Sequence, residues 1–323
     1  MYTIKYIKEF VLLSITILLF KQNTLYSQNN NDSIHKYYSY VYLAEHQLLE
    51  GNIEKSISYY TNAFKFSYPR SKDLYNVFLA SYYINDTIKT KSYANELIIK
   101  GYDISFFTDS ITNPNLYKLI QNKSFLETPN NFICCDSIFY KFCDTIFEDD
   151  QKIRTDSNFI SIQKAKDKQN FEKIKNYIAI NSYPSFEKFG FCNKFSNPIS
   201  ICPTFELILW HNRFEIDSQF IKVLTINLLS GDIQPNEFTK ITIANKDLSN
   251  SLTLKPWEIE KVCKTSSVKN INKKREYYLL DKLEDYLRKY KYHLINKFDK
   301  FIFIDPVLIT NNEIIINSGF YGE

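Results

Sequence analysis

The chain has 323 residues, a net charge of +4 at pH 7 and 16% aromatic residues. This length is sufficient for two domains of about 100–200 residues each. The small net charge gives no strongly basic surface, so no nucleic-acid partner is expected. The sequence has no Walker-type or dinucleotide-binding glycine pattern and no nucleophile elbow. We therefore predict no cofactor from the sequence.

The first 27 residues are typical of a signal peptide. Lys5 and Lys8 give a basic start, and the apolar stretch over residues 10–20 is shorter than the about 20 residues that span a bilayer. Cleavage is expected after the small residue Ser27, and an uncleaved anchor is the alternative. We expect no stable membrane span after cleavage, and a mature protein that is exported to the periplasm or outside the cell.

Residues 37–66 have the pattern of two helices joined by a turn at Gly51. Small side chains at Ala44, Ser56 and Ala63 would let the two helices approach closely. The hairpin resembles a tetratricopeptide repeat at these positions. The resemblance implies an array of helical hairpins that binds a protein or peptide, and such an array needs neighbours to cover its apolar face.

A weaker copy of the hairpin follows. Helices are expected over residues 74–83 and 93–98, with a turn at Asn85-Asp86 and a stop at Gly101. The predicted array therefore covers residues 28–105.

Tyr40, Gln47 and Tyr59 are the candidate partner-binding residues of this array. Tyr side chains recur in the segment. They can stack on sugars or contact a peptide, whereas Tyr at helical spacing is more often part of a core. Both interpretations stay open.

A connector is expected over residues 106–131 and a mainly helical domain over 132–323. Ser218 is expected to cap one of its helices. Two β-rich runs, 301–304 and 313–316, predict a small hairpin. The fold class is therefore mainly α, with helical-hairpin repeats, a helical domain and a small C-terminal β element. The helices expected in the second domain cover 137–153, 165–179, 205–212, 219–229, 235–245 and 272–292.

Residues 269–300 carry ten Lys or Arg and five Asp or Glu in alternation. That pattern predicts a helix face exposed to solvent. His35, His46 and His293 stand among polar neighbours, and we expect them at the surface as well.

The six cysteines are compatible with disulfides in an exported chain. Cys192 and Cys202 flank a short loop and are the disulfide candidate. The cysteines lack the paired spacing and nearby His of zinc sites, so no metal site is predicted.

Residues 150–154 have the form D-Q-x-x-R. Pro184-Ser185, an apolar helix ending in His211, and a G-x-I-x-P segment over 231–235 follow. This order resembles a family of bacterial exported proteins that carry a domain of unknown function, often preceded by helical repeats. The resemblance covers about residues 136–245 and implies no particular reaction.

Asp150, Arg154 and His211 are the candidate catalytic residues. Asp150 and Arg154 are one helical turn apart and can form an ion pair. If the fold brings His211 to Asp150, the two side chains can act as a general base. The alternative is a surface ion pair together with a histidine that caps a helix C-terminus.

The function expected from these observations is binding or assembly through the helical-repeat surface, with a protein or peptide as partner. One alternative is a hydrolase-like enzyme with Asp150, Arg154 and His211 in a cleft. Another is a glycan-binding surface protein. The sequence alone leaves open whether the chain is an enzyme.

Overall fold

The computed structural model describes residues 32–101, 137–154, 159–190, 203–245, 248, 252, 262–265, 267–296 and 301–303. These residues are mainly helical, which confirms the fold class at that level, and none of them lies in a strand. No helix within these ranges is long and apolar enough to cross a bilayer. The predicted signal peptide and connector lie outside the described residues.

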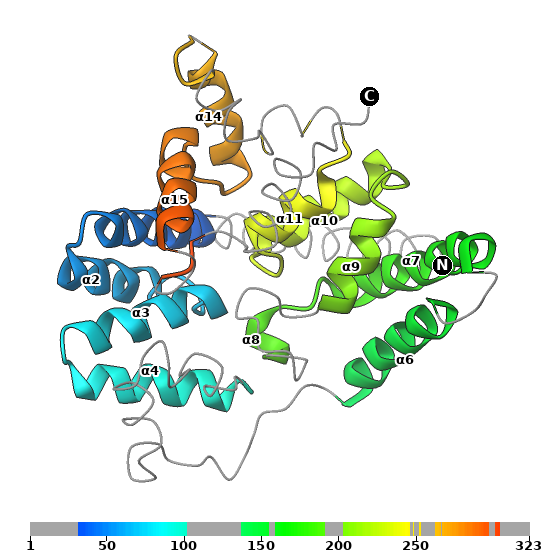
Figure 1. The fold of residues 1–323 in the computed structure, drawn as a ribbon, viewed down its shortest axis with the longest axis horizontal. Helices are drawn as coiled ribbons and strands as arrows, with labels where there is room; N and C mark the ends of the chain where they lie inside the picture. Colours follow the sequence, from blue (N-terminus) through cyan, green and yellow to red (C-terminus); the bar gives the residue numbers. More distant parts are fainter. Residues whose placement is uncertain are drawn as a thin grey trace, which may run out of the picture.

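Two helical hairpins form one side of the molecule (Figure 1). The first pairs a helix over residues 32–49 with α2 (Ile53–Ala63). The second pairs α3 (Ser71–Tyr83) with α4 (Thr87–Ile99), and α3 also packs on α2. Both predicted hairpins are therefore confirmed as helices.

Local signals set the two turns. Gly51 has a φ of 78°, a conformation that favours glycine. Asn85 has a φ of 58°, and the Asp86 carboxylate caps α4 by accepting a hydrogen bond from the Lys89 amide at 3.0 Å. These are the turn positions that the sequence predicts.

Three small side chains of the first hairpin are buried. Ala44, Ser56 and Ala63 are fully buried, as the close-packing argument requires. Tyr37 and Tyr60 are also fully buried, so part of the tyrosine in this segment belongs to the core.

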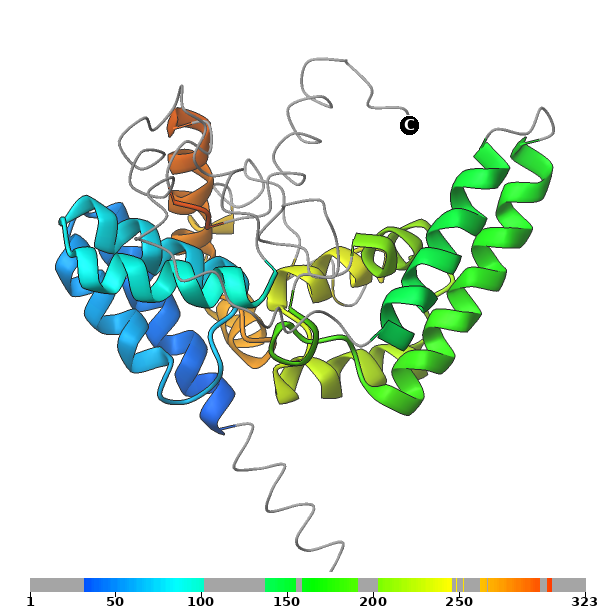
Figure 2. The same cartoon turned by 90° about the horizontal axis from the view of Figure 1, so that it is seen from below.

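Figure 2 shows a long antiparallel helical hairpin on the side opposite to the first two. It is made of α6 (Ser137–Arg154) and α7 (Phe159–Asn181). Short helices lie between the two sides: α8 (Phe186–Phe189), α9 (Pro203–His211), α10 (Ser218–Ser230) and α11 (Pro235–Thr242). Five helices predicted between residues 137 and 245 are thus confirmed, with α7 longer than predicted. One hydrophobic cluster of buried residues joins both sides.

The predicted cap of α10 is wrong by one residue. Asp217, not Ser218, precedes the helix, and its carboxylate accepts a hydrogen bond from the Phe220 amide at 2.7 Å. Ser218 is the first residue inside the helix. Both residue types are good caps, and the backbone of Asp217 takes the extended conformation that capping requires.

The single helix predicted over 272–292 is also wrong. The chain forms α14 (Val268–Tyr277) and α15 (Leu283–Asn296), with Leu279 between them at a φ of 57°. The Arg275 guanidinium donates to the Asp281 backbone carbonyl at 2.7 Å, and this hydrogen bond stabilises the break between α14 and α15. Helical periodicity continues through the break, so the sequence alone does not reveal it.

Residues 301–303 do not form the predicted strand. The Asn76 side chain forms hydrogen bonds with both backbone groups of Ile302. It accepts from the Ile302 N–H at 2.8 Å and donates to the Ile302 carbonyl at 2.7 Å. The Phe303 amide donates to His293 at 2.9 Å. The hydrogen bonds that a second strand would make are thus made by side chains. The other predicted run, 313–316, lies outside the described residues.

His293 is buried rather than exposed. Burial lowers its pKa to about 3, with the charges of Lys72 and Lys289 contributing in the same direction. A neutral imidazole is what the hydrogen bond from Phe303 requires, because the accepting nitrogen must be unprotonated.

Candidate functional site

Helices α6, α7 and α9 are joined at one end by aromatic rings. Phe139 of α6, Tyr177 of α7 and Phe205 of α9 lie with ring centroids 5.3–5.6 Å apart. Such ring pairs stabilise helix packing beyond the area they bury. This contact fixes how the three helices align further along their length.

About three turns farther along α6 and α7, three titratable side chains come together. One ligand atom each of Asp150, Asp167 and His211 lies within 4.8 Å of the other two. We call this group the His–carboxylate cluster. Asp150 is buried, whereas Asp167 and His211 are partly exposed. The structure therefore brings together two residues that the sequence analysis singled out, Asp150 and His211.

Neighbouring polar contacts hold the cluster in place. Asn212, the residue after His211, is buried and donates to the Asp167 backbone carbonyl at 3.2 Å. It also donates to the Ile208 carbonyl at 2.9 Å, which closes the end of α9. The orientation of His211 relative to α7 is thus set by a residue that is packed on both helices.

The adjacent carboxylate, Asp149, is not part of the cluster. It pairs with Lys166 at 3.4 Å and with Lys173 at 3.1 Å, and these bonds lower its pKa, the Lys173 hydrogen bond contributing most. Two adjacent aspartates on α6 thus have different surroundings. Asp149 joins α6 to α7 near solvent, and Asp150 faces the interior.

Two sequence expectations differ from this arrangement. Arg154 ends α6, and its side chain lies outside the described part of the chain. Asp167 was not predicted as a site residue. It lies in the lysine-rich α7, where charged residues surround it and no motif marks it.

The cluster offers one imidazole and two carboxylates from three helices. An imidazole beside a carboxylate can exchange a proton with a substrate. The same donor set can hold a divalent cation, because imidazole nitrogen and carboxylate oxygen are both ordinary metal ligands.

A second group of charged side chains is buried where the helix over residues 32–49 meets α15. We call it the ion network. No member exposes more than 8% of its surface, and the members are Glu45, Lys72, Asp73, Arg275, Asp281 and Lys289. The prediction that the charges of residues 269–300 face solvent is therefore wrong for three of them.

Opposite charges from distant parts of the chain pair within the ion network. Glu45 accepts hydrogen bonds from both Lys72 and Lys289. Lys289 also contacts Asp281 at 2.6 Å, and Asp281 contacts Arg275 at 3.2 Å. This pairing is the physical reason that these charges are buried, and it is invisible in the local sequence.

The pKa values in the ion network reflect the same pairing. Burial opposes the charge of Asp281, but Lys289 and Arg275 outweigh it and lower the pKa of that carboxyl. Burial likewise opposes the charge of Lys289, but Asp281 and Glu45 outweigh it and raise its pKa. Both groups therefore stay charged at neutral pH.

A small cavity touches the ion network. It is lined in part by Tyr42, Lys72, Asp281 and Lys289, and its volume is about 20 Å³. Among the described residues, the ion network is thus a packed junction between helices, and this cavity beside it holds about one water molecule.

Two of the three predicted binding residues lie together. The Tyr40 and Tyr59 ring centroids are 6.4 Å apart, and Phe66 stacks on Tyr40 at 5.6 Å. All three rings are partly exposed. Gln47 is buried instead, and its side chain donates to Glu50 at 3.2 Å.

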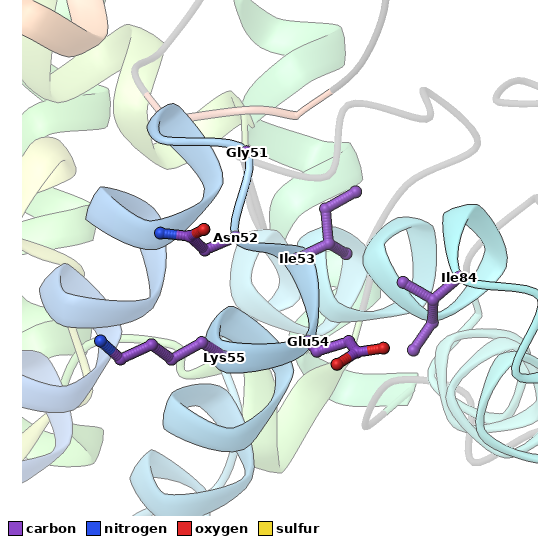
Figure 3. Close-up of a pocket in the computed structure, with 6 residues that line it drawn as sticks. All are labelled: Gly51, Asn52, Ile53, Glu54, Lys55 and Ile84. Carbon is purple, nitrogen blue, oxygen red and sulfur yellow. The ribbon is translucent and has the colours of Figure 1, made fainter.

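A hollow lies at the turn of the first hairpin (Figure 3). Its volume is about 530 Å³, and its described lining consists of Gly51, Asn52, Ile53, Glu54, Lys55 and Ile84. Figure 3 shows Ile53 and Ile84 on one side, whereas Asn52 and Lys55 point the other way. The hollow is open, and it contains none of the predicted site residues.

The predicted disulfide partners Cys192 and Cys202 lie outside the described residues. Comparison of the chain with protein-family models, curated proteins and solved structures finds no match. Both family resemblances therefore remain predictions from the sequence.

Proposed function

We propose that this chain is an exported protein that binds a protein or peptide partner through the first helical hairpin. The observation that carries the proposal is the partly exposed row of rings formed by Tyr40, Tyr59 and Phe66, which we call the aromatic edge. Leu43, one turn along from Tyr40, is 43% exposed beside it. Aromatic rings give large contact areas at low entropic cost, and they dominate many protein interfaces.

The hairpin that carries this edge has a buried interior. Ala44, Ser56 and Ala63 of this hairpin are fully buried, and the rings of the aromatic edge pack on one another. Lys36 lies 5.6 Å from the centre of the Phe66 ring and adds a positive charge at one end. These features favour a peptide or protein segment that presents apolar groups and a carboxylate.

Site-specific photo-crosslinking tests this function. A photoreactive phenylalanine at Leu43 is expected to capture one discrete partner in intact cells, and the product is expected to disappear when Tyr40 and Tyr59 are replaced by Ala. The matched control is the same probe at Ile88, which is 84% exposed on α4. The proposal fails if Leu43 and Ile88 give the same products, or if Leu43 gives none.

A second candidate function is a hydrolase-like enzyme, favoured by the closeness of Asp150 and His211. In that case His211 would act as the general base and Asp150 would orient it. We expect His211→Gln to remove the rise of the hydrolysis rate with pH that an imidazole base produces. A variant that keeps the wild-type pH–rate profile would contradict this role.

A further inference from the structure

The His–carboxylate cluster also has the composition of a metal site. We propose that Asp150, Asp167 and His211 bind one Zn²⁺ ion. The three side chains come from three different helices, and their ligand atoms already lie within 4.8 Å of one another. Zinc bonds of about 2.0–2.2 Å place tetrahedral ligand atoms about 3.4 Å apart, so small side-chain rotations are sufficient.

The donor set narrows the kind of cation to the transition metals, of which Zn²⁺ is the one we propose. Mg²⁺ and Ca²⁺ prefer shells made entirely of oxygen, whereas Zn²⁺ accepts imidazole nitrogen and carboxylate oxygen together. With three protein ligands, a fourth position is left for water or another ligand. This is the arrangement of reactive zinc sites rather than closed structural ones.

The electrostatics of the cluster also favour a bound divalent cation. Asp150 is 4% exposed, and a second carboxylate lies beside it. Two carboxylates so close together repel each other, and a divalent cation neutralises both. The nearby Lys166 and Lys173 both pair with Asp149.

Contacts around the cluster align the three helices that carry it. The aromatic contact of Phe139, Tyr177 and Phe205 aligns the three helices. Asn212 attaches the end of α9 to the backbone of Asp167, next to the ligand it would position. Outer contacts of this kind commonly orient metal ligands.

A competing arrangement uses the same residues without metal. A protonated His211 at the C-terminal end of α9 would be stabilised by the helix dipole and by the two carboxylates. In that case the chain would take up no Zn²⁺ at this position. The inference does not depend on the proposed partner-binding function, because cation uptake is measured without partner or substrate.

Isothermal titration of the purified full chain with Zn²⁺ tests the proposal. We expect one site in the wild type, and an affinity at least about tenfold lower in His211→Gln and Asp167→Asn. The matched control is Glu148→Gln, which removes an exposed carboxylate of α6 and is expected to keep the wild-type affinity. Circular dichroism melts confirm that each variant is folded.

Substitution with Co²⁺ distinguishes this site from the cysteines. The expected absorption spectrum is that of nitrogen and oxygen ligands, without thiolate charge-transfer bands. The proposal is overturned if the wild type binds no Zn²⁺, if thiolate bands dominate, or if Glu148→Gln weakens binding as much as Asp167→Asn does.

Discussion

Replacing Lys289 by Met is expected to lower the free energy of unfolding by about 3–5 kcal/mol, because buried carboxylates would lose a cationic partner. Lys289 is 3% exposed and contacts both Glu45 and Asp281. Its ammonium also lies 4.5 Å from the centre of the Tyr42 ring. Met keeps a similar length and apolar stem, so the change mainly removes the charge. Urea denaturation followed by circular dichroism measures the effect.

The control for this prediction is Lys291→Met on the same helix. Lys291 is exposed, so a change within about 0.5 kcal/mol is expected. The double variant Glu45→Gln with Lys289→Met should lose less free energy of unfolding than the sum of the two single variants, because the two residues are in contact. Equal stability of the Lys289 and Lys291 variants would show that the ion network does not stabilise the fold.

Gly190→Ala is expected to be the second most damaging change, with a loss of about 2–4 kcal/mol from backbone strain together with a steric clash. Gly190 ends α8 with a φ of 61° and a ψ of −146°. A Cβ at this position would lie 2.5 Å from the backbone oxygen of Lys100 at the end of α4. The Lys100 ammonium donates to the Glu187 carbonyl at 2.6 Å, so this contact joins the second N-terminal hairpin to α8.

Gly51→Ala separates the effect of backbone strain from that of the steric clash. Gly51 also has a positive φ, of 78°, but a Cβ there meets nothing within 4 Å. Only the backbone strain applies, and a loss of about 1–2 kcal/mol is expected. Thermal and urea unfolding of both variants provide the comparison. If the two substitutions lower the free energy of unfolding by the same amount, the close approach of α8 to α4 has no effect on stability.

Much of the helical framework could be predicted because its signals are local. Gly51 and Asn85-Asp86 mark the turns of the two hairpins, and Gly231 and Pro235 mark the end of α10 and the start of α11. Each of these residues acts through its own backbone preference. The break at Leu279 was missed because its cause, the contact between Arg275 and Asp281, lies outside the helical pattern.

The candidate site was predicted in part. The sequence singled out Asp150 and His211 as residues whose meeting would matter, and the structure places them together. Asp167 joins them because α7 packs antiparallel on α6, which brings residues from the two helices opposite each other. No feature of the lysine-rich α7 sequence distinguishes Asp167 from its charged neighbours.

The sequence by itself determined that this protein is mainly helical, that its N-terminal part forms two hairpins, and which small residues of the first hairpin are buried. Those properties depend on contacts within one turn or between adjacent helices. Only the tertiary structure decided which charges are buried and which titratable groups meet. Glu45 and Lys289 are 244 positions apart, and such pairing depends on how the whole chain packs rather than on any local pattern.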